Sequence, residues 1–365
     1  MAPLKRIFSV LFFVLLTGSL SAKDFQEYVT PVPESLYPKE KGVCYDESTL
    51  PVSAIHTMHY VQCGNPAGYP VVVFHGGPGG GLSKSMRLMF DPDFFRVILY
   101  DQRGAGSSTP YASIEENTTP LLIEDVEKLR IHLDIEKWGV MGHSWGATMA
   151  LLYAEEQQDR TSFIAVAGIW LSREKDVDWY LRGGAGQFYP EAWKQFFDFI
   201  PADERGDLVA AYHKRLNGVD EAMANEAAIR WVSWEINLLQ IKALTADALD
   251  PAQILPVARL ENHYFANRSF ISRTKQILRP SRLAHITGIP TVIINGRYDM
   301  VCNAYATVEL HKALPSSHLV FTNTGHDLWD GQKYEFARTM QGALDWIRDQ
   351  IAPPISTSRP AEIVQ

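Results

Sequence analysis

The chain has 365 residues, of which 46% are hydrophobic and 21% are charged. This composition excludes intrinsic disorder, and the length is sufficient to bury one large core. The formal net charge of -8 argues against nucleic acid or an anionic membrane as the main partner, because neither attracts an acidic surface.

The first 22 residues have the layout of a secretory signal peptide, so residues 1–22 are predicted to be one. Lys5 and Arg6 precede a largely apolar run over 7–16, and small residues follow up to Ala22. An uncleaved N-terminal anchor is the alternative. In either case the folded part is expected to be exported, periplasmic or secreted. No later stretch reaches the roughly 18 uninterrupted apolar residues of a membrane-spanning helix.

The sequence contains three cysteines, Cys44, Cys63 and Cys302. None are spaced as C-x-x-C, so a zinc site or a thioredoxin-like site is not expected, and no metal is predicted. In an oxidising compartment Cys44 and Cys63 could pair across an N-terminal hairpin. The alternative is that both are buried and unpaired.

Short apolar runs alternate with segments of helical spacing from Ser53 to about Gln350. Continuous apolar runs of this kind are typical of buried strands, and their alternation with helices predicts an α/β fold with a mostly parallel sheet covered on both faces. The predicted buried strands are 71–74, 97–100, 138–141, 163–166, 291–294 and 318–321.

The stretch 172–286 breaks this alternation and is rich in Trp, Tyr, Ala and charged residues at helical spacing. It is interpreted as a helical cap over the C-terminal edge of the sheet, where open α/β sheets place their ligands. The core is then 45–171 together with 287–350. A tail over 351–365, dominated by Ser, Thr and Pro, is expected to be disordered.

The strongest local motif is Gly142-His143-Ser144-Trp145-Gly146, which lies between a predicted strand and a predicted helix. In a G-x-S-x-G elbow the two glycines allow a sharp turn that exposes the serine hydroxyl at the start of the helix. The alternative is an ordinary Gly-rich turn. The strand–turn–helix context favours Ser144 as a nucleophile.

A serine nucleophile needs a base, and the base needs a carboxylate that orients it. In folds with such an elbow the acid precedes the histidine along the chain. Asp299 follows the strand 291–294, and His326 follows the strand 318–321; of eleven histidines, only His326 is late, in a loop and just beyond a strand end. Asp327 is the rival acid, but its position next to His326 directs its side chain the wrong way.

The negative oxygen formed during acyl transfer needs backbone N–H donors. One is expected from Trp145, directly after the nucleophile. The second is expected from Gly77 in the loop His75-Gly-Gly-Pro-Gly-Gly-Gly81, which follows the first predicted strand. A flexible loop or a phosphate cradle is the alternative, although the Gly-Lys-Ser/Thr of a P-loop is missing.

Several longer strings resemble the proline iminopeptidase (prolyl aminopeptidase) family of α/β-hydrolase-fold serine peptidases. They are Asp101-Gln-Arg-Gly-Ala-Gly-Ser-Ser108, Trp234-Glu235, Glu261-Asn-His-Tyr-Phe265 and Gly296-Arg-Tyr-Asp-Met-Val-Cys302, together with the glycine loop and the elbow. The resemblance covers about residues 45–350. It implies an enzyme that removes an N-terminal proline from peptides with a free N-terminus, without metal or cofactor.

The resemblance also implies roles for residues of the cap and its surroundings. Glu235 and Glu261 would bind the substrate's α-amino group, since a cationic amine entering a poorly hydrated pocket needs carboxylates. Without the resemblance, Glu235 is interpreted as a carboxylate on a surface helix. The pocket for the proline ring would be formed by Tyr180, Phe265, Cys302 and Trp170, which otherwise read as ordinary core residues.

The chain departs from the family pattern at two positions near the elbow. His143 stands where relatives usually have glycine, and Ala167 stands where an arginine is typical. The N-terminal leader is also unusual, because most relatives look cytoplasmic. Two other functions are considered: a carboxylesterase or amidase of relaxed specificity with the same triad, and an inactive hydrolase-fold binding protein.

Overall fold

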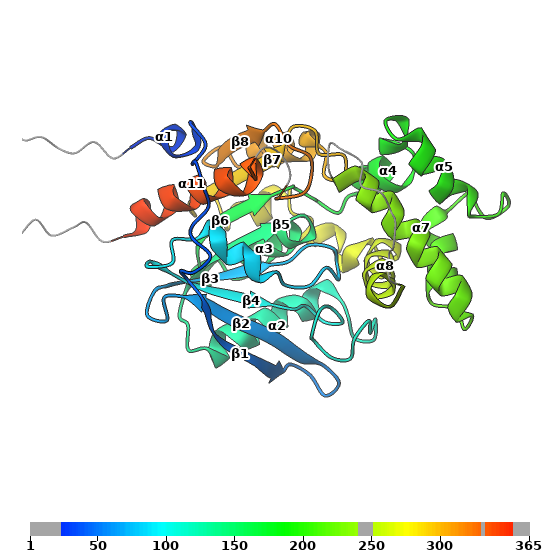
Figure 1. The fold of residues 1–365 in the computed structure, drawn as a ribbon, viewed down its shortest axis with the longest axis horizontal. Helices are drawn as coiled ribbons and strands as arrows, with labels where there is room; N and C mark the ends of the chain where they lie inside the picture. Colours follow the sequence, from blue (N-terminus) through cyan, green and yellow to red (C-terminus); the bar gives the residue numbers. More distant parts are fainter. Residues whose placement is uncertain (1–22, 240–250, 330–332, 353–365) are drawn as a thin grey trace, which may run out of the picture.

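The computed structural model describes residues 23–239, 251–329 and 333–352. The expected signal peptide 1–22 and most of the expected tail, residues 353–365, lie outside the described residues. The described chain is built on one eight-stranded sheet in the order β1-β2-β4-β3-β5-β6-β7-β8 (Figure 1).

The sheet is parallel except at one edge. The antiparallel edge consists of β1 (Cys44–Pro51) and β2 (Thr57–Gly64), and β2 pairs antiparallel with β4. The parallel strands are β3 (Tyr69–Phe74), β4 (Phe95–Tyr100), β5 (Trp138–His143), β6 (Thr161–Ala167), β7 (Thr291–Gly296) and β8 (His318–Thr322). The predicted mostly parallel sheet is confirmed.

The prediction that β8 is a buried strand was wrong. Its residues 318–321 are half-buried and only Thr322 is buried, because β8 is the last strand of the sheet and pairs only with β7. An apolar run does not distinguish a central strand from an edge strand.

Helices cover both faces of the sheet, each over its own apolar cluster. One face packs against α2 (Thr119–His132), α3 (Trp145–Glu156) and α10 (Ala304–Ala313). The other packs against α1 (Phe25–Val29), the 3-10 turn η1 (Lys84–Met89) and α11 (Glu335–Ile351). The buried side chains of α11 recur at helical spacing, as expected for an amphipathic helix, and include Phe336, Met340, Leu344 and Ile347.

The Cys44–Cys63 disulfide, which the sequence left open, is present and joins β1 to β2 at paired positions. Cys302 is free and buried. The two strands at this edge of the sheet are therefore cross-linked by a covalent bond.

Most of the stretch 172–286 forms a group of helices at one end of the sheet, to the right in Figure 1. They are α4 (Glu174–Leu181), α5 (Pro190–Asp198), α6 (Leu208–Leu216), α7 (Glu221–Leu239) and α8 (Pro251–Ala266), followed by α9 (Pro280–Leu283). Short 3-10 turns complete the described elements: η2 (Gln158–Arg160), η3 (Ala185–Gln187), η4 (Arg268–Phe270) and η5 (Arg273–Lys275). Among the residues described, none of the helices combines the length and apolar character needed to cross a bilayer.

Candidate active site

Ser144 lies in a strained turn between β5 and α3. Its φ of 60° and ψ of -127° fall in a region that residues other than glycine rarely occupy. The flanking glycines have no room for side chains: a Cβ at Gly142 would lie 2.0 Å from the Gly146 carbonyl oxygen, and one at Gly146 would lie 2.0 Å from the Phe74 oxygen. The structure thus has the sharp turn that the motif predicts.

Asp299 and His326 come from the loops after β7 and β8 and are hydrogen-bonded to each other. His326 Nδ1 lies 2.8 Å from Asp299 Oδ2, and both side chains are buried. The other carboxylate oxygen accepts the backbone N–H groups of Val301 at 2.9 Å and Cys302 at 2.7 Å. These bonds orient the carboxylate toward the imidazole and leave Nε2 of His326 for a further partner.

The thiol of Cys302 lies close to both Ser144 and the Asp299–His326 pair. The Cys302 sulfur, a carboxylate oxygen of Asp299 and a ring nitrogen of His326 lie within 4.8 Å of one another. The Ser144 side chain interacts with the same thiol and lowers its pKa slightly against the larger effects. Burial, followed by the charge of Asp299, raises the pKa of Cys302 well above its usual value, so the thiol stays protonated and is a poor nucleophile.

Two opposing effects, burial and nearby negative charges, set the pKa of the His326 imidazole. Burial lowers its pKa, but the charge and hydrogen bond of Asp299 and the charge of Glu235 raise it, and the net pKa lies above the usual 6.5. A base whose pKa lies near the working pH transfers protons well in both directions. The arrangement can therefore take a proton from a hydroxyl and return it to a leaving group.

The glycine loop after β3 packs against the elbow. A Cβ at Gly76 would lie 3.3 Å from the Cβ of Ser144 and 3.9 Å from its Oγ. Gly77, expected as an oxyanion donor, is the next residue and has a φ of +106°, which favours glycine. Trp145, the other expected donor, is the first residue of α3. Trp145 therefore follows the nucleophile directly in the chain, and Gly77 follows Gly76, which packs against the nucleophile.

Gln102 ties the glycine loop to the elbow. Its backbone N–H donates to His75 Nε2 and its side-chain amide donates to the His75 carbonyl, both at 2.9 Å. Its Oε1 accepts the indole N–H of Trp145 at 2.8 Å. In the sequence the string around Gln102 is only a marker of resemblance, whereas in the structure it holds the glycine loop against the elbow.

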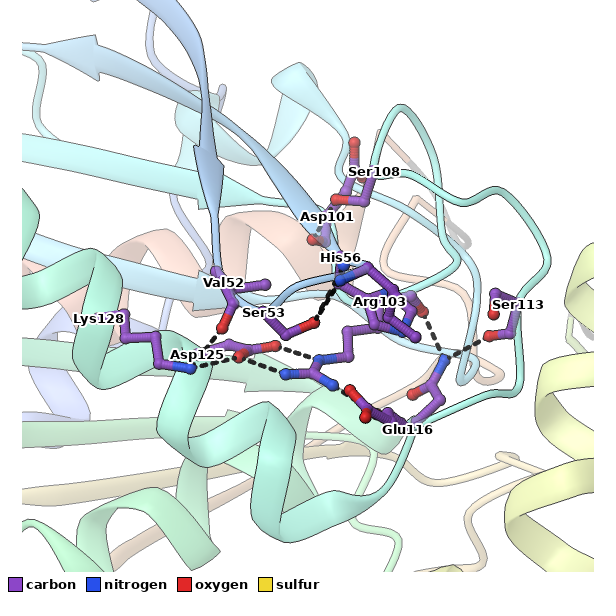
Figure 2. Close-up of polar contacts among 12 residues, drawn as sticks. Val52, Ser53, His56, Asp101, Arg103, Ser108, Ser113, Glu116, Asp125 and Lys128 are labelled. Carbon is purple, nitrogen blue, oxygen red and sulfur yellow. Dashed lines mark hydrogen bonds and ion pairs between the residues drawn. The ribbon is translucent and has the colours of Figure 1, made fainter.

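Arg103 anchors the same string to α2, as Figure 2 shows. Its guanidinium forms a buried, two-pronged ion pair with Asp125, with N–O distances of 2.6 and 2.8 Å, and donates to the Glu116 carbonyl at 2.5 Å. Asn117 donates to the Arg103 carbonyl at 2.9 Å and accepts the Tyr264 hydroxyl at 2.7 Å. Because Tyr264 lies on α8, this network connects the core to the helix that carries Glu261.

Glu235 on α7 and Glu261 on α8 are hydrogen-bonded to each other. Glu261 is only 2% exposed, and the indole N–H of Trp231 donates to its Oε2 at 2.7 Å. Burial raises the pKa of Glu235. Burial and the neighbouring Glu235 raise the pKa of Glu261 well above its usual value, so burial and proximity both disfavour ionisation of the two carboxyl groups together. Trp231, one helical turn before Glu235, was not predicted as a site residue.

The three aromatic residues expected around a proline ring are gathered beside these carboxylates. The ring centroids of Trp170 and Phe265 are 5.4 Å apart, and that of Tyr180 lies 6.1 Å from each. Burial, helped by the neighbouring acidic groups Glu235 and Glu261, raises the pKa of Tyr180 well above 10, and Cys302 acts on the same phenol. This aromatic group (Trp170, Tyr180 and Phe265) therefore adjoins both the carboxylates and the thiol beside Ser144.

Asn295, at the end of β7, joins the loop that carries Asp299 to the loop after β6. Its side-chain oxygen accepts from the backbone N–H of Ile169 at 3.0 Å and from Thr307 at 2.8 Å. Its amide nitrogen donates to the Gly296 carbonyl at 3.0 Å and to the Cys302 carbonyl at 3.2 Å. All hydrogen-bonding capacity of this fully buried amide is thereby used.

Residues 69–330 match the family model described as alpha/beta hydrolase fold. The chain is 45% identical over 287 residues to a proline iminopeptidase of Arabidopsis thaliana, covering 77% of this chain and 75% of that protein. It is 42% identical over 305 residues to a proline iminopeptidase of Xylella fastidiosa, covering 82% and 96%. A proline iminopeptidase-related protein from Thermus thermophilus matches the fold with a TM-score of 0.51 at 20% identity, covering 82% and 97%.

Proposed function

Because this chain belongs to the proline iminopeptidase family of the α/β-hydrolase fold, we propose that it is a serine aminopeptidase that releases an N-terminal proline from peptides. The observation that carries the proposal is the position of the paired carboxylates Glu235 and Glu261. They adjoin the aromatic group, and Glu235 acts electrostatically on His326. An amine bound there is held next to the reacting groups.

The chemistry follows from the roles proposed for Ser144, His326 and Asp299. Ser144 Oγ attacks the carbonyl carbon of the first residue while its proton passes to His326, and Asp299 stabilises the imidazolium. The C–N bond breaks, and His326 gives the proton to the leaving amine. Water then attacks the aminoacyl ester, loses a proton to His326, and Ser144 regains its proton as proline leaves.

The backbone N–H groups of Gly77 and Trp145 are proposed to bind the oxyanion in both steps. Glu235 and Glu261 are proposed to bind the α-amino group, which restricts cleavage to the end of a chain. The pyrrolidine ring is proposed to lie against the aromatic group and Cys302, where flat apolar faces provide contact area.

The proposal is tested by comparing proline β-naphthylamide with its N-acetylated form. Hydrolysis of the free amine only is the expected result. Equal rates on both would contradict amine recognition, and faster turnover of short acyl p-nitrophenyl esters would favour a relaxed esterase. Covalent labelling by a fluorophosphonate, lost in Ser144→Ala, distinguishes an enzyme from a binding protein.

We further propose that the protein is exported to the periplasm or the medium. The leader-like residues 1–22 and the Cys44–Cys63 disulfide support this proposal, because disulfides persist mainly in oxidising compartments. Cell fractionation with N-terminal sequencing of the mature chain tests it. A full-length chain in the cytosol with free thiols at both positions would contradict it.

A further inference from the structure

The backbone of His326 is held from two sides by groups outside its own loop. Its carbonyl oxygen lies 2.9 Å from Nε2 of His143 in the elbow. Its N–H donates to the Leu239 carbonyl at 2.8 Å, and the Asp327 N–H donates to the same carbonyl at 2.9 Å. The peptide group before His326 is thus hydrogen-bonded to the cap, and the peptide group after it is hydrogen-bonded to both the cap and the elbow.

The His143 ring also packs directly on the His326 ring. Their centroids are 4.6 Å apart with planes inclined by 37°, and Phe336 of α11 meets the His143 ring edge-on at 5.9 Å. Gly168 makes room for both rings: it has a φ of +54°, and a Cβ there would lie 2.9 Å from His143 Nε2 and 3.2 Å from His326 Cε1. The two imidazoles therefore occupy one close-packed site.

The chemistry of this contact fixes the protonation of His143. A carbonyl oxygen can only accept, so Nε2 of His143 carries the proton. Burial, followed by the charge of His326, lowers the pKa of His143 well below 6.5, which keeps its ring neutral. The ring therefore donates its hydrogen bond without adding a second positive charge when His326 becomes an imidazolium.

We propose that His143 is a positioning residue for His326, acting through the Nε2–H bond to the His326 carbonyl and through ring packing. The inference rests on the proposed role of His326 as the base. The Leu239 carbonyl holds the other side of the same residue from α7, four residues after Glu235. The helix that carries an amine-binding carboxylate thereby also fixes the backbone of the base.

The test compares His143→Phe with His143→Gln. Phenylalanine keeps a flat ring but has no donor, whereas the glutamine amide can place a donor near the position of Nε2. We expect His143→Phe to lower the fluorophosphonate labelling rate and kcat on proline β-naphthylamide by about 10- to 100-fold, because small displacements of a reacting group have effects of that size. KM should stay unchanged, and His143→Gln should restore most of the rate.

The pH profile separates positioning from simple stabilisation. The titratable groups that act on His326 in the structure are Asp299, Glu235, Asp327 and His143, and the buried Cys302 adjoins it. If His143→Phe loosens the bond between His326 and Asp299, the acid limb of the labelling rate should move down in pH, toward an unpaired imidazole. A purely structural role would lower the melting temperature and leave the rate and limb of the folded enzyme unchanged.

His56→Phe is the matched control. His56 is also buried and bonds a carbonyl through Nε2, at 2.8 Å to Glu115, but it takes no part in the site. Wild-type rates and pH profile in His143→Phe, measured with the control, would overturn the inference. Labelling does not require recognition of an amine or of proline, so a wild-type enzyme that labels but spares proline amides contradicts the proposed function without affecting this result.

Discussion

Glu235 and Glu261 are hydrogen-bonded to each other from two different cap helices, α7 and α8. Glu261 is buried and Glu235 is half-buried, and two carboxyl groups this close do not readily both ionise without a cation between them. In the proposed function, the ammonium group of the substrate supplies that cation, and each helix contributes one carboxylate to its binding site.

Replacing Glu261 by glutamine should weaken hydrolysis of substrates with a free amine. The amide cannot offset the charge of the ammonium group. Removing one partner of a buried charge pair weakens binding of the other by about 3 kcal/mol, which corresponds to roughly 100-fold in kcat/KM. Steady-state kinetics on proline β-naphthylamide measure this change. The same variant should keep its rate on acetyl p-nitrophenyl ester, which has no amine; an equal loss on both substrates would contradict amine binding.

The acid limb of kcat/KM should lie above pH 6.5. His326 must be neutral to accept the serine proton, and its pKa is raised, so activity falls as the pH drops through that raised value. Glu235→Gln removes one of the negative charges that raise it and should move the limb to lower pH. Profiles on an ester substrate report the limb without the amine; a limb unmoved in Glu235→Gln would refute the electrostatic link.

Asp299→Asn should lower kcat by about 10⁴-fold, because an amide no longer fixes the imidazole tautomer or stabilises the imidazolium. Asp327→Asn is the matched control, since it is the neighbouring carboxylate that bonds the Trp329 backbone instead. Burst kinetics with an ester substrate measure both variants. A larger loss at Asp327 than at Asp299 would reverse the assignment of the acid.

Ser144, Asp299 and His326 could be proposed from the sequence because each follows an apolar run that predicts a strand, and the carboxyl ends of parallel strands meet at one edge of the sheet. Strand ends, chain order and the elbow's glycines are all local features. The Asp299–His326 bond and the strained backbone at Ser144 agree with that reasoning. The aromatic group and the paired glutamates were reached only through family resemblance, because they come from segments without a local motif.

Other relationships had no local feature that could reveal them. The Leu239 carbonyl is a backbone group, and its contact with His326 depends on how the cap is docked rather than on residue type. The His143 contact joins two distant positions. Trp231 lies one turn before Glu235, so its indole could have been suspected once that glutamate was assigned. The edge position of β8 depends on topology, which an apolar run does not encode.

Phe265→Ala should reduce the preference for proline over alanine. The substitution removes contact area that the proline ring uses and that the alanine methyl group does not reach. The loss is about 1–2 kcal/mol, or roughly tenfold in the ratio of kcat/KM for proline to kcat/KM for alanine. Proline and alanine β-naphthylamides measured in parallel give this ratio. Phe188→Ala, an exposed cap position, is the control; an unchanged ratio in Phe265→Ala would remove this residue from the pocket.

Removing the disulfide should affect stability and spare catalysis. The bond joins residues 19 apart in sequence, for which chain-entropy arguments give about 3 kcal/mol of stabilisation. It lies on the antiparallel edge rather than at the site. Cys44→Ala combined with Cys63→Ala should lower the urea midpoint and leave kcat unchanged. Reductant should lower the midpoint of the wild type only; a wild type insensitive to complete reduction would contradict this.

The single amide of Asn295 ties together two walls of the proposed substrate site. One wall carries Trp170, the other carries Asp299 and Cys302, and both are fastened to the same side chain. A protein engineer who grafts either loop from a relative would therefore shift the other as well. Exchanges of substrate preference between such enzymes should succeed when the two loops, residue 295 and Thr307 are transplanted as one unit.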